Sequence, residues 1–263
     1  MFSSRVSTWS NYNQWRGGLP ATNPSYTWTV PVGVANINTS IKQFGSGSMF
    51  GNTGGGYIQS TTSSNAMSVG TGDFTVEGWY YVPSARSITS TVDAIVNNAV
   101  GGLGIRFGAT YNNNNFNAIS IFARNVADGN YANITWPRDR WNHWVAQRSG
   151  SGTAAAAITF WVNGTRLTTI AGAPPSGDMI ARNFLTGNST SITIGNYNSG
   201  GLADENLRNG YLDEILVTKG LARYDPAGPI VVPTEPFVVD QYTGLLMHMD
   251  GTSGSTTFTN ATS

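Results

Sequence analysis

The chain has 263 residues, with 14 Lys or Arg against 14 Asp or Glu, and it has no cysteine. A formal net charge of zero argues against binding to nucleic acid or to an anionic membrane, and the lack of thiols excludes disulfide bonds and thiolate metal sites. No window approaches the roughly 18 apolar residues of a membrane span, so we expect one large all-β domain with arms.

Residues 1–40 are predicted to form an N-terminal arm. Its aromatic residues Trp9, Tyr12 and Trp15 are spaced by three, which places them on one side of a short helix. Residues 26–32 alternate between apolar and polar side chains, which predicts an edge strand. The arm packs either over its own domain or into a neighbouring subunit as an assembly arm, and the sequence favours neither alternative.

Residues 41–225 carry the alternating pattern of a β-sandwich. One strand is predicted at residues 74–82, and further strands at 141–148 and 158–162, where Asn163-Gly164 predicts a hairpin turn. On the first of these strands the predicted core side chains are Phe74, Val76, Tyr80 and Val82, and the side chains predicted to face away are Glu77, Trp79 and Tyr81.

The stretch from Gly210 to Phe237 combines a strand with a proline-rich exit. In Tyr211–Thr218, strict alternation places Asp213, Ile215 and Val217 on one side and Leu212, Glu214 and Leu216 on the other. Prolines at positions 226, 229, 233 and 236 hold the following chain extended and remove backbone donors. Residues 226–244 are therefore predicted to be an extended tether that leaves the sheet.

Four motifs occur in order, namely KQFGSGSMF at 42–50, GDFTVEGW at 72–79, WNHWVAQRS at 141–149 with FWVNGT at 160–165, and GYLDEILVTKGLARY at 210–224. Together they resemble a laminin-G-like module of the concanavalin A-like lectin/glucanase superfamily, of the kind found in virion proteins of tailed bacteriophages. The resemblance implies an all-β, jelly-roll β-sandwich of two antiparallel sheets, here with extended N- and C-terminal arms.

The family pattern also implies which side chains of residues 141–162 face outward. Trp144, Ala146, Ile158, Phe160 and Val162 would face the core, while His143 and Trp161 would face away from it. Trp79, Tyr81, His143 and Trp161 would then share one face, and such aromatic and polar side chains suit a sugar or a protein partner. The alternative is that this face is covered by residues 171–190 or by the N-terminal arm.

The resemblance also implies a candidate cofactor, a structural calcium ion at the edge of the sandwich. Asp213 and Asp250 match the positions that would supply carboxylate oxygens, which are suitable ligands for calcium. Asp213 could equally accept hydrogen bonds from turn amides, so both interpretations remain open.

Residues 245–263 resemble the first strand and turn of such a module, although here they come last. Leu245, Met247 and Met249 alternate with Leu246, His248 and Asp250, as in a strand covered on one face and partly covered on the other. We expect this strand to fill the empty place beside Tyr211–Thr218, either in its own subunit or in a neighbouring one. Completion of its own sandwich is favoured because of its high effective concentration.

No catalytic set is evident in the sequence. Glycoside hydrolases of this fold carry carboxylates two residues apart on one strand, but Glu77 is a lone acid and Asp213-Glu214 are predicted to point to opposite faces. The histidines, His143 and His248, lie on separate strands without a neighbouring ligand or base. We therefore expect a protein that is not an enzyme.

The resemblance implies a structural protein of a bacteriophage virion, assembled in the host cytoplasm. It would decorate a capsid or form part of a tail fibre, with other virion proteins and further copies of itself as partners and with no nucleic acid or membrane partner. The alternative is a lectin-like module that binds host-surface glycans through the face of Trp79, Tyr81 and Trp161.

Overall fold

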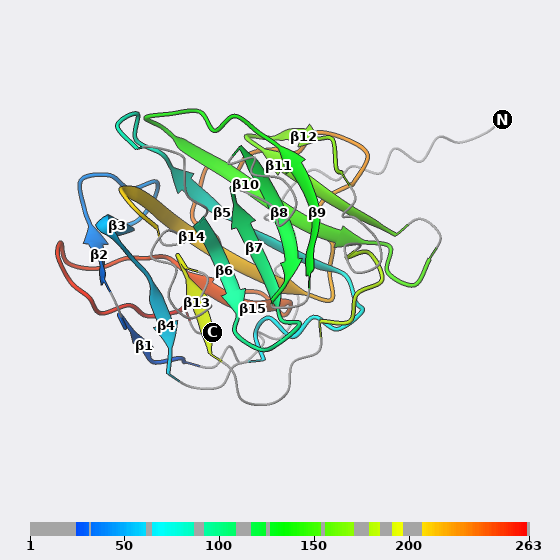
Figure 1. The fold of residues 1–263 in the computed structure, drawn as a ribbon, viewed down its shortest axis with the longest axis horizontal. Coiled ribbons are helices and arrows are strands. Elements are labelled where there is room, and N and C mark those ends of the chain that lie inside the picture. The colour runs from blue at the N-terminus through cyan, green and yellow to red at the C-terminus, as the bar shows by residue number, and fades with distance from the viewer. Residues whose placement is uncertain are drawn as a thin grey trace.

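The structure is a computed structural model. It describes residues 25–31, 33–61, 65–86, 92–108, 117–124, 127–153, 156–170, 179–184, 191–196 and 207–261. Within these ranges the chain contains strands and no α-helix, and the strands form two antiparallel sheets that lie face to face (Figure 1). This confirms the all-β, two-sheet sandwich that the sequence predicted.

The first sheet has seven strands. In spatial order they are β1 (Trp28–Thr29), β4 (Ile58–Ser60), β13 (Ile192–Ile194), β6 (Val92–Asn97), β7 (Leu103–Phe107), β8 (Ala118–Ala123) and β9 (Ala127–Asn133). The short strand β1 pairs with β4 at the edge of this sheet.

The second sheet has eight strands. Seven of them follow in the spatial order β12 (Thr165–Leu167), β11 (Ala157–Val162), β10 (Trp141–Ser149), β5 (Phe74–Tyr81), β14 (Gly210–Lys219), β3 (Ser48–Gly56) and β2 (Gly33–Asn38). The eighth, β15 (Thr243–Met247), pairs with β14. Beyond its pairing with β5, β14 therefore has two neighbours, because Gly210–Leu212 pair with β3 and Ile215–Thr218 pair with β15.

The main hydrophobic core lies between the two sheets, and period-two alternation explains which side chains enter it. From β5, β10 and β11 the core takes Phe74, Val76, Tyr80, Trp144, Ala146, Ile158, Phe160 and Val162, as predicted. Trp79 belongs to a second, smaller cluster with Leu216, Phe237 and Leu246. We call the side of the eight-stranded sheet that carries this second cluster the outer face.

The alternation predicted for β14 is wrong beyond Asp213. Asp213 lies opposite Trp79 and Leu216 lies opposite Glu77, so two residues of β14 face a single residue of β5. Glu214 has a positive φ of 52°, which is unusual for a glutamate. The result is a β-bulge that shifts the register by one residue, so that Asp213 and the residues Glu214 and Leu216 all belong to the outer face.

Gly220 follows β14, and the chain from there to β15, residues 221–242, is called the strap below. It contains no helix or strand, and its two ends are adjacent because Lys219 N donates to Tyr242 O at 2.8 Å. The sequence predicted a tether leaving the sheet, but the strap lies against the outer face instead. The apolar strap side chains in the second cluster are Val232, Phe237 and Val239.

The C-terminal residues fill the place beside β14 within their own chain. Leu245, Met247 and Met249 are buried in the main core, and Phe258 joins them. Ser255 O accepts a hydrogen bond from Ile37 N at 2.8 Å, which ties the tail to β2. Without these C-terminal residues, the main core would therefore lack four of its buried side chains.

The predicted aromatic anchors Trp9, Tyr12 and Trp15 lie outside the described residues. Of the predicted arm, the structure describes residues 25–31 and 33–40, and β2 belongs to the eight-stranded sheet. In the described parts of the chain, no helix has the length and apolar character needed to cross a membrane.

Candidate functional site

The candidate site is the set of polar and aromatic side chains on the outer face beneath the strap. It is built on β5 and β10, whose register places Thr75 opposite Gln147 and Trp79 opposite His143. These four side chains are buried, with Trp79 at 4% exposure and the other three at 0%. Because the strap covers them, their polar groups depend on partners within the protein. Among the described residues, Trp79 Nε1 and His143 Nδ1 have no hydrogen-bond partner.

Gln147 binds the main chain of the strap. Its Oε1 accepts a hydrogen bond from Tyr224 N at 3.0 Å, and its Nε2 donates to Tyr224 O at 2.8 Å. Thr75 Oγ1 accepts from Arg223 N at 3.0 Å and donates to Gln147 Oε1 at 3.0 Å. Side chains here take the role that a neighbouring strand plays in a sheet, and they fix the strap by its backbone.

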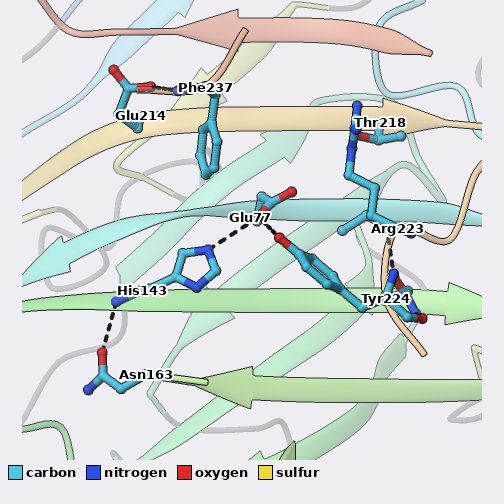
Figure 2. A network of polar contacts seen from close by, with 10 residues as sticks. Glu77, His143, Asn163, Glu214, Thr218, Arg223, Tyr224 and Phe237 are labelled. Carbon is cyan, nitrogen blue, oxygen red and sulfur yellow. Dashed lines mark hydrogen bonds and ion pairs between the residues drawn. The ribbon is translucent and has the colours of Figure 1, made fainter. Parts of the chain in front are cut away.

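Glu77 is the centre of a buried polar cluster (Figure 2). Its Oε2 accepts a hydrogen bond from the hydroxyl of Tyr224 at 2.7 Å and lies 3.2 Å from Nε2 of His143. Among the described residues, none hydrogen-bonds to Glu77 Oε1 or His143 Nδ1. The cluster therefore anchors the strap through a single carboxylate oxygen.

The next anchors lie further along the strap, where it crosses β11 and its hairpin. Trp161 Nε1 donates to Gly228 O at 2.8 Å, and Ile230 N donates to Gly164 O at 2.9 Å. Arg166 Nε donates to Pro226 O at 2.6 Å. These bonds again use the strap's main chain.

Glu214 holds the far end of the strap. Its Oε2 accepts from Phe237 N at 2.8 Å, and its Oε1 lies 2.7 Å from Nδ1 of His248. The pKa of His248 is raised, mainly by this hydrogen bond to Glu214 and against the effect of burial. Both histidines of the chain thus pair with carboxylates that anchor the strap.

Asp213 and Asp250 both cap the turn between β2 and β3. Asp213 Oδ2 accepts from Gln43 N and Phe44 N at 2.9 and 3.2 Å, and its Oδ1 accepts from Glu214 N at 2.9 Å. Asp250 Oδ1 accepts from the amides of Ser46 and Gly47. Burial raises the pKa of Asp213 to about 8, against the lowering effect of the hydrogen bond from Gln43.

These carboxylates do not fit the predicted calcium ion. A calcium site needs about six to eight oxygen ligands, whereas the oxygens of Asp213 face N–H groups, whose positive ends repel a cation. Within the described ranges there is no group of three or more His, Cys, Asp or Glu side chains placed to hold a metal. The alternative interpretation of Asp213, as an acceptor for turn amides, describes the observed geometry.

The predicted ligand face is closed for three of its four residues. Trp79, His143 and Trp161 face outward, as expected, but their exposed fractions are 4%, 0% and 0%. Among the described residues, the cover comes from the strap, whose Gly228 and Phe237 contact Trp161 and His143. Most of the two segments that the sequence suggested, residues 171–190 and the N-terminal arm, lies outside the described residues. Tyr81 alone remains partly exposed. The prediction was therefore right about the direction in which these three side chains point and wrong about their access to a ligand.

Tyr81 belongs to a row of aromatic side chains at the end of the outer face. Phe50, Tyr211, Tyr81 and Trp141 lie opposite one another on the neighbouring strands β3, β14, β5 and β10. The ring centroids are 4.7 Å apart for Phe50 and Tyr211, and 5.6 Å for Tyr81 with each of Tyr211 and Trp141. Sequence analysis identified only Tyr81, because the register that aligns the row was not predictable.

Comparison with solved structures gives distant similarity in fold. The receptor-binding domain of botulinum neurotoxin mosaic serotype C/D is 11% identical with a TM-score of 0.48, covering 77% of this chain and 48% of its own. The binding domain of Paraclostridial Mosquitocidal Protein 1 is 13% identical with a TM-score of 0.47, covering 75% and 45%. The cellulose-induced protein Cip1 is 18% identical with a TM-score of 0.43, and the match covers 73% of this chain and 90% of Cip1. The chain thus spans about half or less of the neurotoxin and mosquitocidal domains' own length.

A search of curated proteins finds no match to this sequence. The laminin G family model described as "Concanavalin A-like lectin/glucanases superfamily" matches residues 52–221. This match covers well over half of the 263 residues and agrees with the two-sheet sandwich, and the chain therefore belongs to the concanavalin A-like lectin/glucanase superfamily.

Proposed function

We propose that the chain is a non-enzymatic structural protein of a bacteriophage virion, acting through protein–protein assembly in a capsid decoration or a tail fibre. The observation that carries the proposal is the closed outer face. Its polar side chains bind the chain's own strap, with Gln147, Glu77, Trp161 and Glu214 each bonded to it. A face that holds a polypeptide segment in this way serves assembly.

The carboxylates of the face support a role without catalysis. Glu77 and Glu214 are 0% and 1% exposed, and each anchors the strap. A glycoside hydrolase needs two carboxyl groups on either side of an accessible glycosidic bond. The virion assignment is supported by the ordered motifs at 42–50, 72–79, 141–165 and 210–224.

The test is detection and counting of this chain in purified phage particles of its source. Quantitative mass spectrometry against the major capsid protein gives the copy number, and many copies per particle indicate the shell while few indicate the tail. Incubation with bacterial polysaccharides should release no new reducing ends. Absence from intact particles, or release of sugar, would contradict the proposal.

A second candidate function, a lectin-like module for host-surface glycans, is favoured by the aromatic row. Phe50, Tyr81 and Trp141 are partly exposed, and the partly exposed Asn209 flanks them. Aromatic rings beside amide groups suit sugar rings.

This candidate is tested by affinity chromatography on host polysaccharide. Trp141→Ala should weaken retention by about 1–3 kcal/mol if each ring stacks on a sugar, and the exposed apolar residue Val231, at 87% exposure, supplies the control Val231→Ala. Equal retention of both folded variants and the wild type would remove the lectin-like alternative.

A further inference from the structure

The turn that follows β5 carries a buried arginine, Arg86. Its backbone N donates to Pro83 O at 3.0 Å, which closes the turn, and its side-chain Nη1 donates to the hydroxyl of Tyr80. Tyr80 belongs to the main core between the sheets, so this contact is separate from the outer face and its strap. Only 4% of Arg86 is exposed. The guanidinium group therefore ends inside the protein and not in solvent.

One side of this guanidinium group is fixed by its neighbours. The ring centroid of Tyr80 lies 4.7 Å from that of Phe107, with the rings stacked, and 5.2 Å from that of Trp136, with the rings edge to face. A Cβ added at Gly210 would lie 2.8 Å from Arg86 Nη1. Nη1 is therefore held between a rigidly packed hydroxyl and the backbone at the start of β14.

The other edge of the guanidinium group has no partner. Nε and Nη2 of Arg86 are both buried, and neither donates a hydrogen bond to any residue that the structure describes. These two N–H groups point the same way and form the fork with which arginine binds a carboxylate or a phosphate through two parallel hydrogen bonds. Buried polar groups are otherwise almost always hydrogen-bonded. The unpartnered fork therefore matches an oxyanion in both shape and charge.

A second arginine adds positive charge near the same hydroxyl. Arg138, which is partly exposed, donates through Nη1 to the carbonyl oxygens of Pro83 and Arg86 at 2.9 and 2.8 Å. Burial raises the pKa of Tyr80, and the charges of Arg86 and Arg138 act in the opposite direction. Within the described ranges, neither arginine forms an ion pair with a carboxylate. A buried charge without such a partner is unfavourable, and a bound anion would compensate it.

The carboxylate that lies next in the sequence is engaged by the turn. Asp139 Oδ1 accepts a hydrogen bond from Ser84 N at 2.7 Å. Ser84 and Ala85, at the tip of the turn, are exposed. Because Nε and Nη2 of Arg86 are covered, an anion reaches them only through a local movement, and this exposed turn is the shortest segment that provides one.

We propose that Arg86 is the centre of an anion-binding site, in which the carboxylate or phosphate group of a small ligand binds side-on to Nε and Nη2. Tyr80 orients the guanidinium group through Nη1, and Arg138 supplies a second positive charge. The ligand needs two oxygen acceptors on one edge, which a halide ion lacks. The site goes beyond the assembly role proposed above and is independent of it, because it uses no residue of the outer face.

Titration of the wild-type protein is the first test. Sodium phosphate and sodium acetate are compared with sodium chloride at equal ionic strength and neutral pH, by calorimetric titration and by melting temperature. A ligand that binds the folded state raises the melting temperature with its concentration. Binding of phosphate alone assigns the site to phosphate groups, binding of acetate alone assigns it to carboxylates, and binding of both supports the chemistry that they share. Binding of neither anion would overturn the proposal.

Variants separate this site from the general stabilisation that phosphate gives to folded proteins. Arg86→Lys keeps the charge but lacks the planar fork, so it should weaken anion binding about tenfold. Arg140→Lys is the matched control, because Arg140 lies exposed in the same stretch as Arg138, and it should bind as the wild type does. Equal affinities of Arg86→Lys and Arg140→Lys would contradict the site.

Tyr80→Phe replaces Arg86→Lys in this comparison if the lysine variant does not fold. It keeps the aromatic packing and removes the hydroxyl that orients Nη1. Anion binding should then weaken about threefold, because the guanidinium group loses the contact that fixes its plane. A wild-type affinity in Tyr80→Phe would, in that case, contradict the proposal.

Discussion

The side chain of Gln147 and the main chain of Tyr224 form two hydrogen bonds with each other, one through each atom of the side-chain amide. The distances are 3.0 Å from Tyr224 N to Oε1 and 2.8 Å from Nε2 to Tyr224 O. Gln147 is fully buried, so both amide atoms depend on this single partner and on Thr75. The side chain of Gln147 on β10 thus pairs with the strap's main chain in the way that a neighbouring strand would.

Gln147→Ala should destabilise the protein by about 2 kcal/mol, because two net hydrogen bonds are lost and the strap's main chain is left without partners. Urea denaturation measures the loss, and amide exchange at residues 221–242 should accelerate more than exchange in β5. Gln241→Ala is the control, since Gln241 lies in the strap and is exposed. Equal stability of the two variants would show that the strap does not depend on Gln147.

Tyr224→Phe removes the hydroxyl that donates to Glu77 and leaves the ring in place. A hydrogen bond to a charged group contributes about 1.5–3 kcal/mol, so we expect a loss of about 2 kcal/mol in the free energy of unfolding. A double-mutant cycle with Glu77→Gln isolates the pair. Additive effects of the two substitutions would mean that the 2.7 Å contact between Tyr224 and Glu77 contributes nothing of its own.

The orientation of Trp79 followed from the alternation of side chains along its strand, and that of His143 and Trp161 was implied by the family pattern. The structure places all three side chains on the outer face. The cover over them was not predictable. Prolines showed that the strap has an extended backbone with few donors, but its destination depends on long-range contacts such as the one between Gln147 and Tyr224.

At the bulge at Glu214, period-two alternation no longer predicts which face of the sheet a side chain of β14 occupies. A bulge inserts one residue and moves all later side chains to the opposite face. A glutamate at this position does not indicate a bulge, because a positive φ is expected mainly at Gly, Asn or Asp. The consequence reaches the site, because the bulge brings Asp213 and Glu214 to the same face and lets them hold the β2–β3 turn and the strap respectively.

Asp213 should make the stability of the protein fall as pH rises. Burial raises its pKa from 3.8 to about 8, so between these values the folded state binds more protons than the unfolded state, and the free energy of unfolding decreases with pH. His248, whose pKa is raised, contributes in the same direction as pH passes that pKa. Wild type should therefore lose stability between about pH 4 and pH 8, a range set by the pKa of Asp213, and Asp213→Asn should show a flatter profile in urea denaturation. Parallel profiles for the two proteins would contradict the raised pKa.

Calcium should have no effect on the melting temperature. The carboxylate of Asp213 accepts three backbone N–H groups and that of Asp250 accepts two, so neither offers a site for a cation. Calorimetry with added calcium chloride and with a chelator measures this directly. A fall in melting temperature with chelator that disappears in Asp213→Asn would restore the calcium interpretation.

Arg148 should be the side chain of β10 least tolerant of substitution. It is fully buried and donates to the carbonyl oxygens of Gly70, Gly72, Met179 and Arg182, at 2.6 to 3.3 Å. Its guanidinium also lies 4.9 Å from the ring centroid of Phe74. Burial lowers its pKa to about 10, so it remains charged at neutral pH.

One planar guanidinium thus joins two loops, at residues 70–72 and 179–182, which also meet through the isolated bridge between Gly70 and Phe184. Arg148→Lys keeps the charge, but an ammonium group cannot reach both loops at once, and we expect a loss of about 3 kcal/mol in urea denaturation. Arg148→Met should cost more, because it removes every one of these side-chain donors and leaves Gly70 O and Met179 O with only the amides of Phe184 and Arg182. The exposed Arg140 supplies the control Arg140→Lys, which should change stability by less than about 0.5 kcal/mol. Similar stabilities of Arg148→Lys and Arg140→Lys would show that the two loops are held by other contacts.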